Sequence, residues 1–106
     1  MIYGISKVAY GSDRSKITHV IIHEIVNNRI GSPVQMTRHA VIDLIQYGNN
    51  CWAILQNSTG NWDWGAQVHV VTTYHGKFIR TDRNSESRDN LGNLPTFVPR
   101  ITTYSY

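Results

Sequence analysis

A run of ten residues, ITHVIIHEIV from Ile17 to Val26, limits the fold of this chain more than any other sequence feature. Isoleucine, valine and threonine supply most of it, and these β-branched side chains favour extended strands over helices. Because the run is largely apolar with polar interruptions, it predicts a long strand in the middle of a sheet. The remaining segments are therefore expected to supply neighbouring strands and a cover for the sheet.

Other strands are predicted on both sides of this run. Residues Ile2 to Tyr10 predict a weaker strand, and Asn27 to Gly31 predict a hairpin connection into Val34-Gln35. Three later segments also predict strands, the last two joined at Tyr74-His75-Gly76: Cys51–Leu55, Gln67–Thr73 and Lys77–Thr81. We expect a mainly antiparallel sheet, with the end of the chain, Ile101 to Tyr106, pairing as an edge strand within the chain or with another subunit.

One helix is predicted, and it begins after Thr37 as the N-cap residue. Val41, Leu44 and Ile45 share one helical face, and Gly48 provides a left-handed stop. The sequence therefore predicts the α+β class: a small, mainly antiparallel β-sheet packed against one α-helix.

Length and composition narrow the class of protein. At 106 residues the chain predicts a single domain, because two cores would each bury too little apolar surface. A single cysteine, Cys51, excludes an internal disulfide framework and is expected to be an inert, half-buried strand thiol. No segment resembles a signal peptide or approaches the roughly 20 apolar residues that span a bilayer. We therefore expect a cytoplasmic protein without membrane contact.

The charge of the chain favours phosphate as a partner. The net charge is +3, which is too weak to argue for duplex nucleic acid by itself. Seven of the ten cationic side chains are arginines, whose planar fork of donors suits phosphate oxygens and bases. At the helix start, Arg38 and His39 lie where the macrodipole disfavours cations, so something anionic is expected beside them. Either a phosphate binds at this end of the helix, or the first turn is solvated and its charges point away from it.

Two further clusters have a structural and a functional interpretation. His19 and His23 lie four residues apart on a strand, with no carboxylate or cysteine at ligand spacing, so core or cross-strand histidines are favoured over a metal site. The three tryptophans, Trp52, Trp62 and Trp64, either stack a base or, more often in proteins, fill a core or a subunit contact.

The segment from Phe78 to Asn84, followed by Arg88-Asp89-Asn90-Leu91, joins an aromatic to three arginines and short amide or acid side chains. This mixture suits a nucleotide, because arginines meet phosphates, an aromatic stacks, and Asp or Asn meets hydroxyls or a base edge. The same residues also suit a polar loop with an Asx turn. No nucleophile elbow, P-loop or paired zinc motif is present in the sequence, which argues against an enzyme.

These segments together resemble a known family. The ITHVII strand, the helix from Thr37-Arg38 to Tyr47-Gly48, the FIRT segment from Phe78 and the DNLxxLP segment from Asp89 resemble short bacterial and phage domains long catalogued as of unknown function. The resemblance covers roughly residues 17 to 95. Within that group, the length and the arginine-rich end look like the Thoeris anti-defence family of phage proteins.

The narrower resemblance implies a function. Members of that family are sponges, which bind cyclic ADP-ribose isomers and sequester them without cleavage, form hexamers, and take cyclic di- or trinucleotides at separate sites. It implies no cofactor and no catalytic residue here. It implies Phe78 as the stacking residue, and Arg80, Asp89, Asn90 and Arg100 as polar contacts. Arg38 and His39 are candidates for a second phosphate site.

Two alternatives stay open from the residues. The same arginines and tryptophans would line an open groove in a protein that binds single-stranded or structured RNA. A phosphodiesterase that degrades the same cyclic nucleotides is the third interpretation. The salt dependence of binding distinguishes the RNA-binding alternative from a nucleotide pocket. Affinity for a polyanion in an open groove falls steeply as salt rises, whereas affinity for a ligand in a closed pocket falls mildly.

Overall fold

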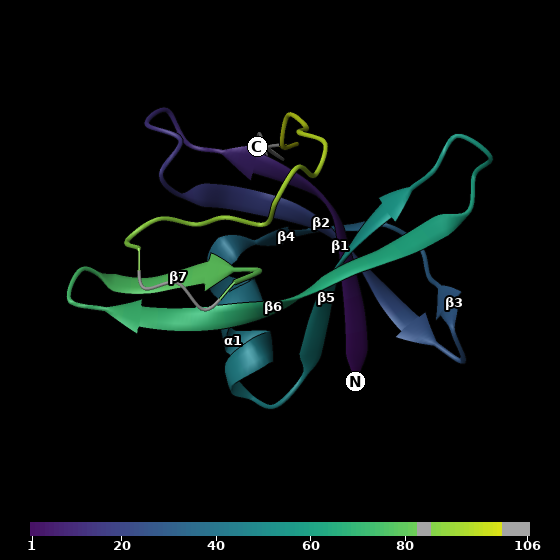
Figure 1. Cartoon of the computed structure of the whole chain (residues 1–106), viewed down its shortest axis with the longest axis horizontal. Coiled ribbons are helices and arrows are strands. Elements are labelled where there is room, and N and C mark those ends of the chain that lie inside the picture. The colour runs from purple at the N-terminus through teal and green to yellow at the C-terminus, as the bar shows by residue number, and fades with distance from the viewer. Residues whose placement is uncertain (83–85, 101–106) are drawn as a thin grey trace, which may run out of the picture.

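The computed structural model describes residues 1–82 and 86–100, and Figure 1 shows one mixed sheet with one helix. It therefore confirms the predicted α+β class, a sheet with one helix packed on it. The strands and helix run in the following order: β1 (Ile2–Tyr10), β2 (Ile17–Val26), β3 (Arg29–Ile30), β4 (Val34–Thr37), α1 (Arg38–Gln46), β5 (Asn50–Gln56), β6 (Trp62–Thr73) and β7 (Gly76–Arg80).

The sheet has the order β3-β2-β1-β5-β6-β7, with β4 paired to the same edge of β2 as β3. The ITHVIIHEIV run is β2, and it has neighbours on both sides, as predicted. Every pair is antiparallel except β1 and β5, which run parallel from Ile2 to Ile5. The mainly antiparallel sheet is thus confirmed, with a parallel pair at its centre.

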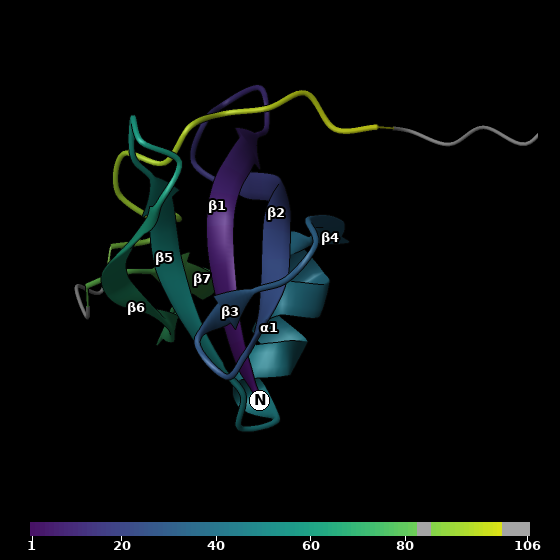
Figure 2. The ribbon, with the colours of Figure 1, turned by 90° about the vertical axis from the view of Figure 1, so that its right-hand side faces the viewer.

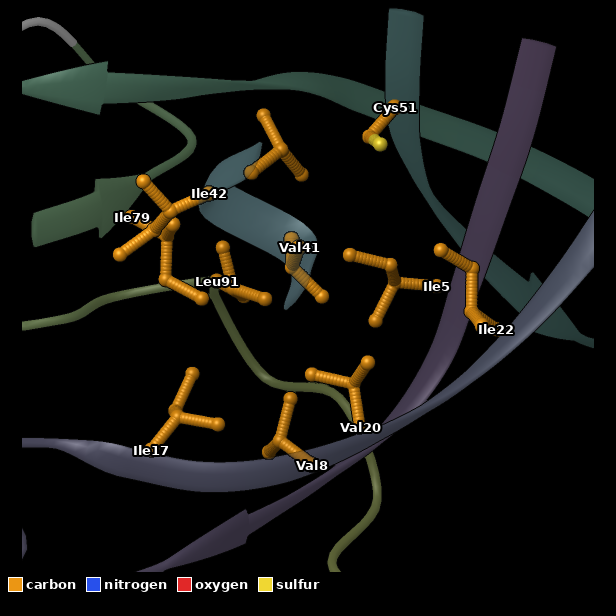
Figure 3. Packing of buried hydrophobic residues seen from close by; sticks show 11 residues of the cluster. Ile5, Val8, Ile17, Val20, Ile22, Val41, Ile42, Cys51, Ile79 and Leu91 are labelled. Carbon is orange, nitrogen blue, oxygen red and sulfur yellow. The ribbon is translucent and has the colours of Figure 1, made fainter. Parts of the chain in front are cut away.

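The helix covers one face of the sheet, where it contacts β2, β4, β5 and β6 (Figure 2). Its predicted ends are correct: the Thr37 side chain accepts a hydrogen bond from the Ala40 N–H, and Gly48 has a φ of 96°. Val41 and Ile42 project from the helix into a cluster of buried aliphatic residues from the sheet (Figure 3). Cys51 belongs to this cluster and is fully buried, where the sequence predicted a half-buried thiol.

The predicted strand from Gln67 was too short, because β6 begins at Trp62. Trp62 and Trp64 pair with Gln56 and Ile54 of β5, so the tryptophan segment extends the hairpin. The turn residues Asn27 and Asn28 both adopt positive φ, as a tight hairpin requires. The predicted edge strand from Ile101 to Tyr106 lies outside the described residues.

The carboxyl-terminal halves of β1 and β5 diverge, and a later segment fills the space between them. The parallel pairing ends at Ile5 and Ala53, and beyond it Val8 exchanges backbone hydrogen bonds with Pro95 and Phe97. We call residues 86–96 the strap. It leaves β7 at one side of the sheet and crosses to β1, so that it runs over the diverging strands (Figure 1).

Candidate functional site

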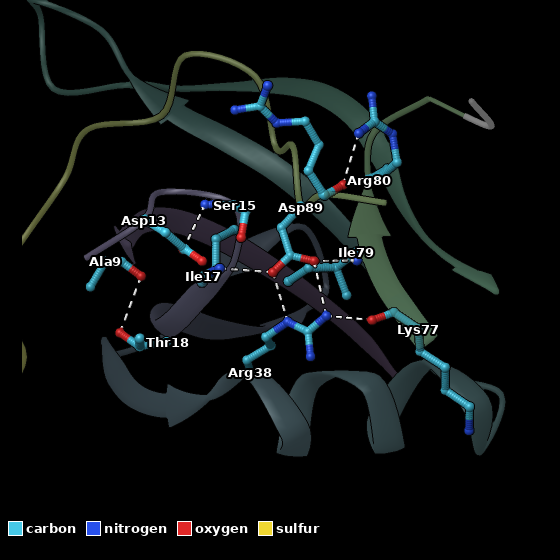
Figure 4. Close-up of polar contacts among 11 residues, drawn as sticks. Ala9, Asp13, Ser15, Ile17, Thr18, Arg38, Lys77, Ile79, Arg80 and Asp89 are labelled. Carbon is cyan, nitrogen blue, oxygen red and sulfur yellow. Dashed lines mark hydrogen bonds and ion pairs between the residues drawn. The ribbon is translucent and has the colours of Figure 1, made fainter. Parts of the chain in front are cut away.

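Asp89 of the strap is the centre of a buried hydrogen-bond network (Figure 4). The residue is 3% exposed, and its carboxylate accepts hydrogen bonds from the backbone N–H groups of Ile17 at 2.7 Å and Ile79 at 2.9 Å. Arg38 of α1 donates to both carboxylate oxygens, from Nε at 2.7 Å and from Nη2 at 3.1 Å. Hydrogen bonds to a charged group contribute about 1.5–3 kcal/mol each, so Asp89 joins strap, helix and two strands.

The sequence left open whether a bound phosphate or solvent lies beside Arg38, and the structure shows a carboxylate of the chain there instead. Arg38 bonds Asp89 and donates from Nη2 to the Lys77 carbonyl. His39 turns away from this network, with a side chain 86% exposed and Nε2 3.6 Å from Asp43. The structure thus does not bring Arg38 and His39 together, and Arg38 has its own carboxylate partner.

The Arg80 guanidinium is likewise hydrogen-bonded within the chain. Its side chain is 2% exposed and donates to Asp82 through Nε at 2.7 Å and Nη2 at 3.1 Å. Nη1 donates to the Arg88 carbonyl at 2.8 Å. The hydrogen bond to Asp82 raises the pKa of the guanidinium, against the opposing effect of burial. Arg80 therefore fixes the return of the chain from β7 into the strap.

Phe78, the predicted stacking residue, is 2% exposed and lies in the core. The cations of Lys16 and Arg38 lie over its ring, at 5.8 Å and 5.6 Å from the ring centre. A ring covered in this way offers no open face to a base, and none of the pockets described below is lined by it. We assign Phe78 to packing beneath the Arg38–Asp89 pair.

A polar pocket of about 550 Å³ opens on the outer side of the strap. We call it the arginine pocket, and its lining includes Tyr10, Arg14, Arg88, Asn90, Asn93 and Thr96. Asp89 and Glu86 also line it, and each bonds an arginine of the chain: Asp89 bonds Arg38, and Glu86 lies 3.9 Å from Arg80. The volume lies within the range of about 300–1,000 Å³ that small-molecule sites occupy.

Arg14 and Arg88, which line this pocket, differ from Arg38 and Arg80 in their pairing with acids. The Arg14 guanidinium lies 4.9 Å from the centre of the Tyr10 ring, and its backbone has a φ of 58°. Arg88 is exposed, and its contact with Arg80 uses its carbonyl rather than its guanidinium. Among the described residues, neither guanidinium has a carboxylate partner. Two unpaired forks of donors beside one aromatic ring can accept an anionic ligand.

The predicted site residues thus lie in three places: in the arginine pocket, in hydrogen-bond networks or packing within the chain, and beside β4. Asp89 and Asn90 line the arginine pocket, whereas Phe78, Arg80 and Arg38 are held within the chain. Arg100 lies elsewhere, beside β4, where its backbone N–H donates to the Gln35 side chain at 2.8 Å. Arg83 and Asn84 of the predicted nucleotide segment lie outside the described residues.

Tyr10, Arg14 and the side chain of Arg88 were not predicted as contacts. Arg14 follows β1 by four residues, whereas Arg88 is far away in the sequence, so spacing gave no sign that they share a pocket. The turn residues around Arg14, Gly11-Ser12-Asp13, were the sole sequence signal that an arginine there would project from a loop.

The sequence also gave no sign of a hydrogen-bonded serine and histidine on the sheet. Ser6 lies at a bulge in β1, and its Oγ is 2.8 Å from Nε2 of His23, whose Nδ1 donates to the Gly31 carbonyl at 2.9 Å. Both side chains are about 95% buried, Ser6 at 6% and His23 at 5% exposure, and Trp62 packs edge-on against His23. Neither residue lines any of the four main pockets formed by residues 1–82 and 86–100, and their burial makes the pair part of the packing.

Comparison with known proteins places the chain in a family. The model of a family described as a protein of unknown function, DUF3892, matches residues 4–95. The chain belongs to this family. The matched residues run from within β1 through β7 and include the helix and nearly all of the strap. No curated protein and no solved structure matches the chain.

The family description agrees with the predicted resemblance to short domains of unknown function and names no ligand. The narrower resemblance to Thoeris anti-defence proteins stays a proposal. Within residues 1–82 and 86–100, no helix is long and apolar enough to cross a membrane. The same residues contain no cluster of three histidine, cysteine or acidic side chains suited to a metal ion.

Proposed function

We propose that this protein binds a small phosphate-bearing nucleotide in the arginine pocket and holds it without converting it. The observation that carries the proposal is the pair of guanidinium groups, Arg14 and Arg88, that face one pocket and have no carboxylate partner among the described residues. A pyrophosphate carries the charge and the acceptor oxygens that two such forks can bond.

The ligand class we propose first is that of cyclic ADP-ribose isomers, with cyclic di- or trinucleotides at a second site. A cyclic ligand is preorganised, which lowers the entropy cost of capture. Sequestration needs tight binding of the ground state and no activated water. The hydrogen-bonded Ser6–His23 pair lies outside the arginine pocket, which fits binding without chemistry.

The proposal includes assembly and biological role. By the resemblance, the chain is a phage anti-defence sponge in the host cytoplasm, assembled as a homo-oligomer with the hexamer as the expected form. Exposed apolar side chains such as Tyr47, Tyr74 and Val98 offer surface for such contacts. The second site would rest on His39 rather than on Arg38, because Asp89 already holds Arg38.

The test is a capture experiment. Purified protein is incubated with cyclic ADP-ribose isomers and cyclic oligonucleotides, filtered, and then heat-denatured, and the ligand is analysed by chromatography. We expect intact ligand to be depleted before heating and recovered afterwards. Arg14→Gln and Arg88→Gln should each weaken binding by about 10- to 100-fold, the usual effect of losing a charge-assisted hydrogen bond.

Arg29→Gln is the matched control, since Arg29 is an exposed arginine on β3 at the far edge of the sheet. It should bind as tightly as the natural protein. Recovery of a converted product would make the protein a phosphodiesterase. A lack of depletion, together with RNA binding that weakens steeply with salt, would replace the proposal by the RNA-binding alternative.

A further inference from the structure

A second pocket lies on the other side of the strap from the arginine pocket. It encloses about 350 Å³ between the strap and strands β5 and β6, and its lining is largely apolar. We call it the apolar pocket; Ala53, Leu55, Leu91 and Leu94 contribute to its walls, with Asp63 and Thr81 among its polar residues. Leu55 is 46% exposed, so apolar surface of this pocket is open to a ligand.

The two pockets share three lining residues, Gly92, Asn93 and Leu94. The strap is therefore a divider of a few residues between a polar and an apolar pocket. Both pockets lie where the parallel strands β1 and β5 diverge. Tyr10, the last residue of β1, lines the arginine pocket, and Leu55, near the end of β5, lines the apolar pocket.

At Gly92 the strap between the two pockets has no side chain. Its φ of 77° favours glycine, and a side chain built there would meet no atom within 4 Å. The Gly92 N–H is already bonded to the Asn90 side chain at 2.9 Å, which holds the backbone in this conformation. A ligand that crosses the strap at this residue meets backbone and open space rather than a side chain.

We infer that the two pockets form one bipartite nucleotide site, with the base in the apolar pocket, the phosphates at Arg14 and Arg88, and the sugar across Gly92. This inference rests on the proposed function and deepens it by naming the second recognition element. A base is flat and largely apolar, which suits walls made by Leu55 and Leu94. Asp63 and Asn93 lie at that pocket to meet base or sugar hydrogen-bonding groups.

Two substitutions test the inference against probes with and without a base. Gly92→Asn adds a side chain at the crossing while keeping a residue that tolerates positive φ. Leu55→Glu puts a charge in the apolar pocket at an exposed position. The probes are cyclic ADP-ribose and inorganic pyrophosphate, titrated by calorimetry.

We expect the natural protein to bind cyclic ADP-ribose at least about tenfold more tightly than pyrophosphate, which corresponds to burying roughly 50–60 Å² of apolar base surface. Each variant should lose that advantage and keep its affinity for pyrophosphate. The controls are Gly60→Asn, at a positive-φ glycine that also has open space around it, and Val26→Glu, at an exposed strand valine. Both should bind as the natural protein does.

The outcomes separate the two proposals. Equal affinity for both probes, or a cyclic ADP-ribose affinity unchanged by Gly92→Asn and Leu55→Glu, overturns the bipartite site and leaves the arginine pocket intact. Loss of pyrophosphate binding in Arg88→Gln tests the pocket separately. If neither probe binds the natural protein, both proposals fail. Circular dichroism and thermal unfolding of each variant exclude a loss of fold as the cause.

Discussion

Arginine and short acid or amide side chains lie on both sides of the strap, where they hold the fold on one side and line a pocket on the other. On the inner side, Asp89 is 3% exposed and saturated by two backbone N–H groups and the Arg38 guanidinium. On the outer side, the neighbouring residues Arg88 and Asn90 are exposed and line the arginine pocket. Three consecutive residues of the strap therefore provide both the buried anchor and part of the pocket wall.

This comparison separates arginines that hold the fold from arginines that are free to bind. Arg38 and Arg80 have carboxylate partners within the chain and little exposed side chain, at 19% and 2%. Arg14 and Arg88 have none among the described residues. A cluster of arginines in a sequence therefore indicates a ligand site only for those members that the fold leaves without an acid.

The largest expected effect is on the inner side. Asp89→Ala leaves the Arg38 charge without its acid and removes the acceptor of the Ile17 and Ile79 N–H groups. Breaking such a buried pair costs about 3–5 kcal/mol. Urea unfolding should show this loss in the free energy of unfolding.

Asp43→Ala is the control for the loss of a carboxylate, since Asp43 lies on the exposed face of α1 with a half-exposed side chain. It should change the free energy of unfolding by no more than about 0.5 kcal/mol. A cost below about 1 kcal/mol for Asp89→Ala would break the comparison, because the inner side would then not be the anchor.

An intermediate effect is expected from a matched pair of arginines. Arg80→Gln removes the bonds to Asp82 and leaves a buried amide in their place, so we expect a loss of about 2–4 kcal/mol in unfolding free energy. Arg88→Gln should stay within about 0.5 kcal/mol, as surface substitutions do. Equal destabilisation by the two variants would show that Arg88 also serves the fold.

The smallest effect concerns Cys51, which lies in the same buried cluster as Leu91 of the strap. Burial raises the pKa of its thiol from 9.0 to about 11. Above pH 9 the unfolded chain loses this proton first, so the folded state loses stability as pH rises from 9 toward 11. The loss should reach about 1 kcal/mol by pH 10 and should be absent from the pH slope of Cys51→Ala.

The rate at which the Cys51 thiol is labelled also reports how tightly the inner side of the strap is held. Cys51 is fully buried and burial raises the pKa of its thiol, so labelling of the folded chain by a maleimide at pH 8 should be slow. Asp89→Asn, which loosens the inner side, should speed the labelling, and Arg88→Gln should leave its rate unchanged. Equal rates in the two variants would contradict the division of the strap into an anchoring and a binding side.

Local sequence signals determined much of the fold. The β-branched run gave β2, the Thr37 cap and Gly48 gave both ends of α1, and turn residues gave the hairpin from β6 to β7. These elements follow from steric preferences and from hydrogen bonds between residues close in the chain. The start of β6 was missed because Trp62 to Trp64 pair with β5, whereas Gly65 and Ala66 lie at an irregularity that interrupts the apolar–polar alternation before Gln67.

The sequence by itself determined that the chain is an α+β domain rich in arginine, and it left open whether a phosphate or solvent lies beside Arg38. The tertiary structure placed the carboxylate of Asp89 there, which lies 51 residues further along the chain. It also decided that Phe78 and Arg80 serve the fold and that Arg14 meets Arg88 in one pocket. Burial and pairing depend on distant segments that the strap brings together, and no local pattern encodes them.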